Sequence, residues 1–331
     1  MIGSSAPEPA VSVIVPVYKG LRFLRAALES LKAQTFRDWE CVCVDDGSKD
    51  GSGALADGIA REDPRIRVIH RPNGGTSAAR NTALGVVRGK YVAFLDEDDL
   101  YHPRMLETLH AAAERFGADV AGCGFAGFDE TAHPDFPAEA PLADGWEEAD
   151  RVRLREWVCD YYNGVPFEVW RNLYRREILE GHLFREGVRV EQDMLWHYTL
   201  LPRIGKYVRT SWVGYGWRRN SIGGALHPDP ASEISLLRSS RTVAETLFAE
   251  MGLSAEQKRR LARAMALQLK WNVWGDLRRG LRLTHDESCR LRRGLRDLSA
   301  CGIDIRDLLG GVRRLRWNLF LATGWTGWVR K

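Results

Sequence analysis

The chain has 331 residues, of which 44% are hydrophobic and 28% are charged, which is typical of an ordinary folded protein and excludes a fibrous or disordered chain. This length allows one large domain with an appendage, or two domains. The formal net charge of +4 is unevenly spread, since residues 229–331 carry 20 basic and 11 acidic side chains. No apolar run approaches the length of a membrane-spanning helix, so none is expected.

The cysteines and the N-terminus both point to a reducing compartment. The six cysteines are scattered and contain no CxxC pair, which argues against a zinc site or a disulfide framework. The first ten residues, MIGSSAPEPA, have neither the basic start nor the apolar core of a secretion signal. We therefore expect a cytoplasmic protein.

Strand and helix patterns alternate over the first 116 residues. The β-branched run Val11–Val17 predicts a strand buried on both faces, and leucines at helical spacing from Leu21 to Leu31 predict a helix after it. Further strands are predicted at residues 39–44, 67–70 and 91–95, and further helices at 53–61, 76–87 and 103–116. Such alternation predicts an α/β fold, a parallel sheet covered by helices.

Each predicted strand is followed by a polar cluster: Tyr18–Gly20, Asp45–Ser48, Asn73–Gly75 and Asp96–Asp99. Ligands of parallel α/β sheets bind where the strands end, so a nucleotide or a similar ligand is expected there. The first turn lacks GxGxxG, and no GxxxxGK[ST] occurs, which disfavours the dinucleotide-binding and P-loop classes.

The most unusual cluster is the acidic one, in which the strand Tyr91–Leu95 runs directly into Asp96, Glu97, Asp98 and Asp99. Desolvated like charges at such separations repel strongly. A hard divalent cation that also binds an anionic ligand would relieve this repulsion. The alternative is a solvated acidic helix start before Pro103, because acidic groups favour that end of the helix dipole.

The four strand ends read PVYKG, VDDGSKDGS, NGGTSAARN and FLDEDD, and as a set they resemble the catalytic domain of family 2 glycosyltransferases. The resemblance runs from about Val11 to about Gly224. It implies inverting sugar transfer and a GT-A fold, which is Rossmann-like with a mostly parallel sheet flanked by helices. We therefore expect a catalytic domain over residues 1–228 and a basic, Trp-rich α-helical region over residues 229–331.

The resemblance assigns several residues to the nucleotide. The first strand end would line the base pocket, through Pro16, Val17 and Tyr18. Asp46 would hydrogen-bond the base, with Asp45 beside it. The alternative for this aspartate pair is a turn with a helix cap, which the same residue types favour.

Two further segments resemble parts of the family that lie near the diphosphate. The segment from Asn73 to Asn81 would lie beside base and pyrophosphate, with Arg80 closest to the donor, unless Arg80 is a structural tie to an acid. Arg218, in a later aromatic–Arg–Ser segment, would contact phosphate, since a guanidinium pairs well with phosphate oxygens. Arg219 or His227 could share that role, and the alternative is a basic surface loop.

The family's DxD motif maps onto Asp96 and Asp98. By resemblance, Asp98 binds Mg²⁺ or Mn²⁺, and Asp96 contacts the ribose or a metal-bound water. A metal that bridges both phosphates stabilises the departing diphosphate, and magnesium needs only one or two protein carboxylates in such a site. Glu97 points to the other side of an extended chain and is not expected to be a ligand. Asp99 is expected to support the site or cap a helix.

An acceptor-side segment follows, with Trp170–Tyr174 reading WRNLY where the family has WNKLY, and Gln192-Asp193 where Glu-Asp is usual. Asp193 is the expected general base, because single displacement needs a carboxylate to take the acceptor hydroxyl's proton. A helix N-terminus lowers the pKa of an acid, so Asp193 would act mainly through its position. Glu191 is the second candidate, and the alternative for Asp193 is an ordinary acid at the start of a surface helix.

The last twenty residues combine basic side chains with Trp, Leu and Phe, which fits a helix lying in an anionic membrane interface. The alternatives are packing onto the catalytic domain and a homodimer contact. The leading hypothesis is a metal-dependent inverting glycosyltransferase that uses a UDP-sugar and extends a saccharide on a lipid carrier for surface polysaccharide. A catalytically inactive nucleotide-sugar binding module, suggested by Gln192, is the alternative, and nucleic-acid binding has little support.

Overall fold

The computed structural model describes residues 8–130, 132–139, 145–161, 165–188, 190–219, 230–269 and 284–304. The chain divides into two compact units. The first consists of Met1–Arg151, Glu168–Gly187 and Arg203–Ser221, and the second of Val152–Phe167, Val188–Pro202 and Ile222–Lys331. Each unit is described by itself. The predicted division into a catalytic domain over residues 1–228 and a helical region beyond it stays a prediction.

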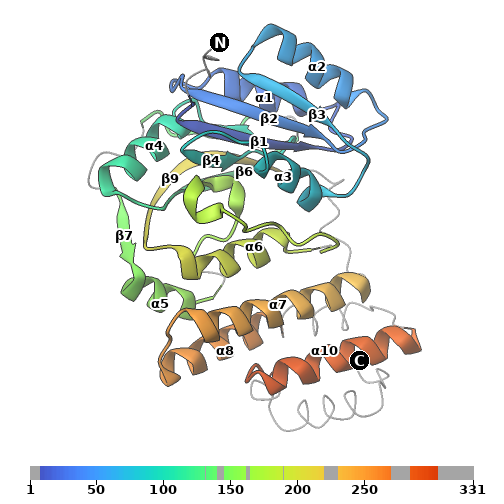
Figure 1. Ribbon diagram of the computed structural model, residues 1–331, viewed down its shortest axis with the longest axis vertical. Helices are drawn as coiled ribbons and strands as arrows, with labels where there is room; N and C mark the ends of the chain where they lie inside the picture. Colours follow the sequence, from blue (N-terminus) through green and yellow to red (C-terminus); the bar gives the residue numbers. More distant parts are fainter. Residues whose placement is uncertain are drawn as a thin grey trace, which may run out of the picture. The chain divides into compact units, whose positions relative to one another are not determined.

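The first unit begins with the predicted alternation of strands and helices (Figure 1): β1 (Val11–Val17), α1 (Leu24–Lys32), β2 (Trp39–Asp45), α2 (Ser52–Glu62), β3 (Ile66–His70), α3 (Thr76–Leu84), β4 (Tyr91–Phe94) and α4 (Met105–Phe116). The last helix starts two residues later than predicted. The cause is a turn at Pro103, in which the Met105 N–H donates to the His102 carbonyl at 2.9 Å.

The remaining strands of the sheet are β5 (Leu100–Tyr101), β6 (Val120–Asp129), β7 (Glu147–Asp150), β8 (Asn172–Arg175) and β9 (Lys206–Arg219). The strand order is β3-β2-β1-β4-β8-β6-β9-β5, with β7 paired to β9. Strands β1 to β4 pair in parallel, as do β6 and β9, whereas β8 runs antiparallel between β4 and β6. The predicted α/β class is therefore confirmed, with a mixed sheet.

The core lies around the parallel strands. Every residue of β1 and β2 is buried, which explains why both are mostly apolar rather than alternating. The buried Glu40 of β2 is an exception and accepts the Ser12 hydroxyl of β1 at 2.7 Å. Helix α1 buries Leu24, Leu28 and Leu31 against the sheet. Burial of each leucine contributes about 2 kcal/mol, so this apolar stripe holds the helix in place.

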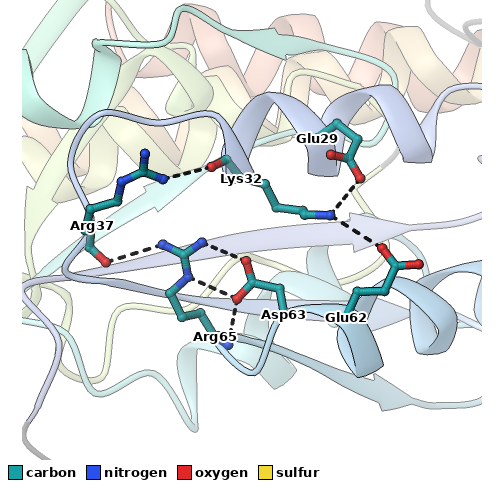
Figure 2. A network of polar contacts seen from close by, with 6 residues as sticks. All are labelled: Glu29, Lys32, Arg37, Glu62, Asp63 and Arg65. Carbon is teal, nitrogen blue, oxygen red and sulfur yellow. Dashed lines mark hydrogen bonds and ion pairs between the residues drawn. The ribbon is translucent and has the colours of Figure 1, made fainter.

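Polar side chains tie the solvent-facing parts of the two helices together (Figure 2). Lys32 donates to Glu29 at 2.9 Å on its own helix and to Glu62 of α2 at 3.5 Å. Arg65 binds Asp63 through Nε at 3.0 Å and Nη2 at 2.7 Å. Glu29 and Glu62 are exposed, so each of the two Lys32 pairs contributes at most about 1 kcal/mol. Asp63, in contrast, is buried, and its pair with Arg65 holds the turn between α2 and β3.

The second unit is helical within the part of the chain that the structure describes. Its helices are α5 (Arg151–Cys159, whose first residue belongs to the first unit), α6 (Gln192–Leu200), α7 (Pro230–Glu250), α8 (Ala255–Leu269) and α10 (His285–Ala300). Helix α7 packs against both α6 and α10. The described residues also contain three short 3₁₀ helices, Val169–Arg171, Arg176–Leu179 and Leu201–Arg203.

Helix α10 starts with a capping box, in which Thr284 and Glu287 satisfy each other's backbone N–H groups. None of the described helices is long and apolar enough to cross a membrane. The basic, Trp-containing C-terminal segment and His227 lie outside the described residues.

Candidate active site

The end of β2 holds the loop after β3 through one buried carboxylate. The two oxygens of Asp46, a residue only 2% exposed, accept the backbone N–H of Gly74 at 3.1 and 3.0 Å, and one accepts that of Gly75 at 2.7 Å. The Asn73 amide donates to the same carboxylate at 3.0 Å, and Arg71 forms an ion pair with it. Asp46 and Asn73, which were predicted separately, are therefore directly hydrogen-bonded to each other. The predicted contact of Asp46 with a base stays a prediction.

Asp45, the last residue of β2, is the anchor of the following turn. It accepts the Ser48 N–H at 3.0 Å and faces Nδ1 of His70 at 3.0 Å, while the other ring nitrogen of His70 lies 3.1 Å from Asp57. Burial alone would raise the pKa of Asp45, but the hydrogen bonds from Ser48 and His70 outweigh it and lower that pKa. The same bonds to Asp45 and Asp57 raise the pKa of His70.

A glycine of α2 lets the Asp45 carboxylate lie against the helix. A Cβ at Gly53 would stand 2.5 Å from Asp45 Oδ2, so only glycine fits this position without a shift. The turn considered as the alternative for Asp45 is therefore present in the structure, but its helix cap is not, because the N-cap residue of α2 is Gly51, which makes no side-chain cap. A role for Asp45 next to the nucleotide is compatible with this turn and stays a prediction.

The end of β1 contacts two of the other strand ends. Lys19, in the left-handed region at φ 58°, donates its N–H to Ser48 Oγ at 3.1 Å, and the Tyr18 N–H points to Glu97 Oε1 at 3.5 Å. The Tyr18 side chain is 43% exposed, so its ring is available to a ligand. Two other predicted base-pocket residues are buried in the strand itself: Pro16 and Val17.

Arg80, in α3, is tied to the acidic loop after β4. Its guanidinium is 3% exposed, donates from Nη2 to Asp96 Oδ1 at 2.8 Å, and lies 5.2 Å from the ring centre of Phe184. The predicted alternative, a tie to an acid, is thus what the structure shows. Because the partner is itself a predicted donor-site residue, Arg80 still lies at the predicted site, and its contact with the donor stays a prediction.

The acidic loop carries more negative charge than its surroundings accommodate easily. Burial, with a further contribution from Asp98 and Asp96, raises the pKa of Glu97 to about 8. The same causes raise the pKa of Asp99 well above its usual range. A group with a raised acid pKa resists ionisation, so a cation in this loop would be electrostatically favoured.

Asp99 has a structural role. Its carboxylate, 2% exposed, accepts the Tyr215 hydroxyl at 2.8 Å and the Arg218 backbone N–H at 2.7 Å. The same Tyr215 hydroxyl accepts the Asp96 N–H at 3.3 Å. Strand β9 therefore holds the acidic loop through Tyr215 and Arg218, in agreement with the supporting position expected for Asp99.

The Arg218 side chain is packed against the acidic loop. Its Nε donates to the Asp98 carbonyl at 2.7 Å and its Nη1 to the Glu130 carbonyl at 2.7 Å. The guanidinium lies between two rings, 4.6 Å from the centre of Phe23 and 4.5 Å from that of Phe128. Arg218 thus fixes the backbone of the predicted metal ligand, and its contact with phosphate stays a prediction.

The two candidate bases belong to the second unit. Glu191 is the N-cap residue of α6, with a φ of 55°, and its carbonyl accepts the Leu195 N–H at 3.1 Å. Asp193 lies in the first turn of the same helix, where it was expected. Gln192 donates from its side chain to the Val188 carbonyl at 2.8 Å, so its departure from the family pattern has a local structural use.

Asp96 and Asp98 fit a metal site in which the protein supplies only one or two ligands. Among the described residues, no group of three or more His, Cys, Asp or Glu side chains could hold a metal ion. A magnesium ion on a diphosphate needs only one or two carboxylates, and it prefers hard oxygen ligands. The carboxylate oxygens of these two aspartates match that requirement in their chemistry, and their binding of a metal stays a prediction.

Two residues that bind predicted site residues were not identified from the sequence. Tyr215 stands in the aromatic–Arg–Ser segment, but its pairing with Asp99 joins positions 116 residues apart. Arg71 stands two residues before the Asn73-Gly74-Gly75 turn. Its basic side chain next to a turn is the one sequence signal that could have identified it. An open cavity of about 470 Å³ beside β9 involves none of the predicted residues, since its lining includes Asp135, Pro137, Thr210 and Trp212.

Comparisons with known proteins identify the fold and the family. The family model described as glycosyl transferase family 2 matches residues 12–183, just over half of the chain. The glycosyltransferase EpsJ of Bacillus subtilis is 38% identical over 192 residues, which are 56% of this chain and 54% of EpsJ. The chain thus spans about half the length of that relative.

Two solved structures share the fold at low sequence identity. S. aureus TarS 1–349, in complex with UDP-GlcNAc, superposes with a TM-score of 0.72 at 19% identity over 90% of this chain and 84% of that one. The mannosyltransferase PcManGT from Pyrobaculum calidifontis, in complex with GDP-Man and Mn²⁺, superposes with a TM-score of 0.54 at 16% identity. The match covers 96% of this chain and 80% of that one. The predicted GT-A fold is confirmed by these likenesses.

Proposed function

Because this chain belongs to glycosyl transferase family 2, we propose that it moves a sugar from a nucleotide-sugar donor, a UDP-sugar, to a saccharide or lipid-linked acceptor. The observation that carries the proposal is that the polar residues following the strands are hydrogen-bonded to one another. Asp46 binds the loop at Gly74 and Gly75, and Arg80 binds Asp96. The UDP-GlcNAc complex of the fold neighbour TarS supports uridine as the nucleotide.

The base would bind at the ends of β1 and β2. There the exposed ring of Tyr18 offers an apolar surface, and the loop at Asn73 is held rigid by Asp46. A preformed pocket binds more tightly because less ordering entropy is lost on binding. In this proposal Asp46 acts chiefly by shaping the loop, and any contact it makes with the base is additional.

Asp98 and Asp96 would hold Mg²⁺ or Mn²⁺, and when bound the ion would stabilise the negative charge of the departing diphosphate. The chain's own residues orient these ligands. Arg80 fixes the Asp96 carboxylate, Arg218 fixes the Asp98 backbone, and Tyr215 supports the loop through Asp99. The Mn²⁺ complex of PcManGT supports a divalent ion in this fold.

Asp193 would take the proton of the acceptor hydroxyl as its oxygen attacks the anomeric carbon, which inverts the configuration there. Glu191 is the alternative base. The first turn of α6 orients Asp193 but also lowers the pKa expected for an acid, so catalysis would depend on placement more than on base strength. A surface polysaccharide on a lipid carrier is the proposed acceptor, with the basic C-terminal segment as a peripheral membrane contact or, alternatively, a homodimer contact.

The first test measures donor binding and turnover together. We expect UDP-GlcNAc with Mn²⁺ to raise the melting temperature of the full chain, and chelation of the metal by EDTA to abolish that rise. Release of UDP should fall at least a hundredfold in Asp193→Asn while the thermal shift is retained. If neither UDP-GlcNAc nor other nucleotide sugars, such as UDP-glucose and GDP-mannose, change the melting temperature, the proposal is wrong.

A binding module without catalysis would give a different result. It would show the same thermal shift in wild type and in Asp193→Asn, with no enzyme-dependent UDP release in either. Glu191→Gln is the matched control, because it removes a neighbouring acid from the same helix start. Loss of turnover in Glu191→Gln alone would transfer the role of base to Glu191.

A further inference from the structure

Three aromatic side chains stand out as exposed within the described residues. Tyr18, Phe125 and Trp217 are 43%, 39% and 43% exposed. Single exposed apolar residues are common on protein surfaces, but tryptophan carries the largest apolar surface of any side chain and is usually well covered. Tyr18 belongs to the proposed base pocket. The other two come from neighbouring strands, β6 and β9, and the proposed function has not used them.

Phe125 and Trp217 lie on one face of the sheet. In the parallel pairing of β6 with β9, Phe125 is opposite Tyr215 and Gly127 is opposite Trp217. Side chains two apart on a strand point the same way, and register partners share a face, so the two exposed rings are diagonal neighbours. Gly127, between them, adds no side chain that could cover either ring.

The next register pair along the two strands points to the opposite face, as this arrangement requires. Phe128 is opposite Arg218, and these two side chains contact each other with the guanidinium 4.5 Å from the ring centre. Arg218 is buried against the acidic loop, whereas Trp217 next to it is exposed. The alternation is therefore regular in this stretch of β9.

The aromatic face is continuous with the acidic loop. Trp170 stacks on Tyr215 with ring centres 4.3 Å apart and meets Phe125 edge to face at 5.1 Å. The Tyr215 hydroxyl in turn donates to Asp99 at 2.8 Å. A chain of direct contacts thus leads from the exposed Phe125 ring to the loop that would bind the metal and the diphosphate.

Charged side chains lie near Phe125 and near Gly127, the residue opposite Trp217. The Arg171 guanidinium lies 5.3 Å from the centre of the Phe125 ring. Arg219 donates to the Gly127 carbonyl at 3.2 Å and lies 3.7 Å from Asp129. Sugar rings present an apolar C–H face and a rim of hydroxyls, so an aromatic floor with guanidinium and carboxylate groups at its edge complements both parts.

The strand order indicates whether the donor or the acceptor would lie on the aromatic face. The proposed base pocket is at β1 to β3, the acidic loop follows β4, and the aromatic face is on β6 and β9, beyond β8. The nucleotide and the aromatic face are therefore on opposite sides of the loop that would hold the diphosphate. A group that receives a sugar from that diphosphate must approach from the side away from the base.

We propose that Phe125 and Trp217, with Trp170 against Phe125, form the subsite for the terminal sugar ring of the acceptor. This inference rests on the proposed glycosyltransferase function and adds to it the place and the chemistry of acceptor recognition. The acceptor is accordingly a pyranoside with at least one apolar face, bound by stacking, and Arg171 and Arg219 hydrogen-bond its hydroxyls.

The test observes Trp217 directly. The full chain is labelled with 5-fluorotryptophan, and the fluorine resonance of Trp217 is assigned from its disappearance in Trp217→Phe. p-Nitrophenyl glycosides of glucose, galactose, N-acetylglucosamine and N-acetylgalactosamine are then titrated. We expect at least one glycoside to shift this resonance saturably, and Trp217→Ala and Phe125→Ala each to weaken its binding at least tenfold.

Donor binding separates this subsite from the proposed function itself. UDP-GlcNAc affinity with Mn²⁺ should stay within twofold of wild type in Trp217→Ala, and Val86→Ala, which trims an exposed apolar residue elsewhere, should change neither affinity. Trp217→Phe should restore most glycoside binding. A Trp217 resonance that no glycoside shifts overturns the proposal, as does a variant that loses donor and glycoside binding equally. Glycoside binding without any nucleotide-sugar binding would retain the subsite and refute the donor assignment.

Discussion

Asp46→Asn is expected to release the loop at residues 71–75 without unfolding the rest of the sheet. The carboxylate receives two backbone N–H groups, from Gly74 and Gly75, together with the Asn73 amide and the Arg71 guanidinium. Asparagine keeps the shape of the side chain but replaces one acceptor oxygen with a donor and removes the charge. At least one loop N–H would then face another donor, and the guanidinium would lose its ionic partner.

The magnitude follows from the number and type of bonds lost. A hydrogen bond to a charged group contributes about 1.5–3 kcal/mol, and removal of one partner of a buried ion pair costs about 3–5 kcal/mol. These effects overlap at one carboxylate, and Arg71 is only partly buried, so we expect a loss of about 3 kcal/mol in the free energy of opening the loop. Since each 1.4 kcal/mol is a factor of ten, the open population rises by about two orders of magnitude.

Hydrogen–deuterium exchange read by mass spectrometry on peptides that cover residues 71–80 measures this opening. Exchange of the loop amides should accelerate about a hundredfold in Asp46→Asn, while peptides from β1 keep their protection. Asp57→Asn is the control, because Asp57 is a more exposed carboxylate, on α2, that pairs with His70. Unchanged protection of the loop in Asp46→Asn would refute the view that this carboxylate holds it.

Two other predictions concern neighbouring contacts. Arg218→Lys should lower the free energy of unfolding by about 2 kcal/mol in urea titrations, because an ammonium cannot keep both carbonyl bonds and the position between two rings. The exposed Arg219→Lys should cost less than about 0.5 kcal/mol, and equal losses in the two variants would contradict this account. For His70, the pKa is raised in the fold, so its stabilising contribution is complete below the unfolded pKa near 6.5 and disappears as pH rises through the folded value. The melting temperature of wild type relative to His70→Gln should therefore be higher at pH 6 than at pH 8.5, and a difference that does not change with pH would contradict the prediction.

Much of the first unit could be predicted from local sequence. Strands β1 and β2 are recognisable because strands buried on both faces are mostly apolar, and α1 because its leucines repeat at helical spacing. The start of α4 was predicted two residues early, since Pro103 suits a first helical turn but belongs here to a separate turn. The antiparallel insertion of β8 between β4 and β6 was not predicted, because strand neighbours along the chain need not be neighbours in the sheet.

The α/β class and the polar residues that end each strand can be predicted from residue patterns, and the family resemblance from the four strand-end motifs, because all of these are local properties of the sequence. How those residues are used depends on the fold. Asp46 proved to hold Gly74 and Gly75, and Asp99 to bind Tyr215. A carboxylate's partners depend on which distant segments the sheet brings beside it, and a linear pattern of residue types does not contain that information.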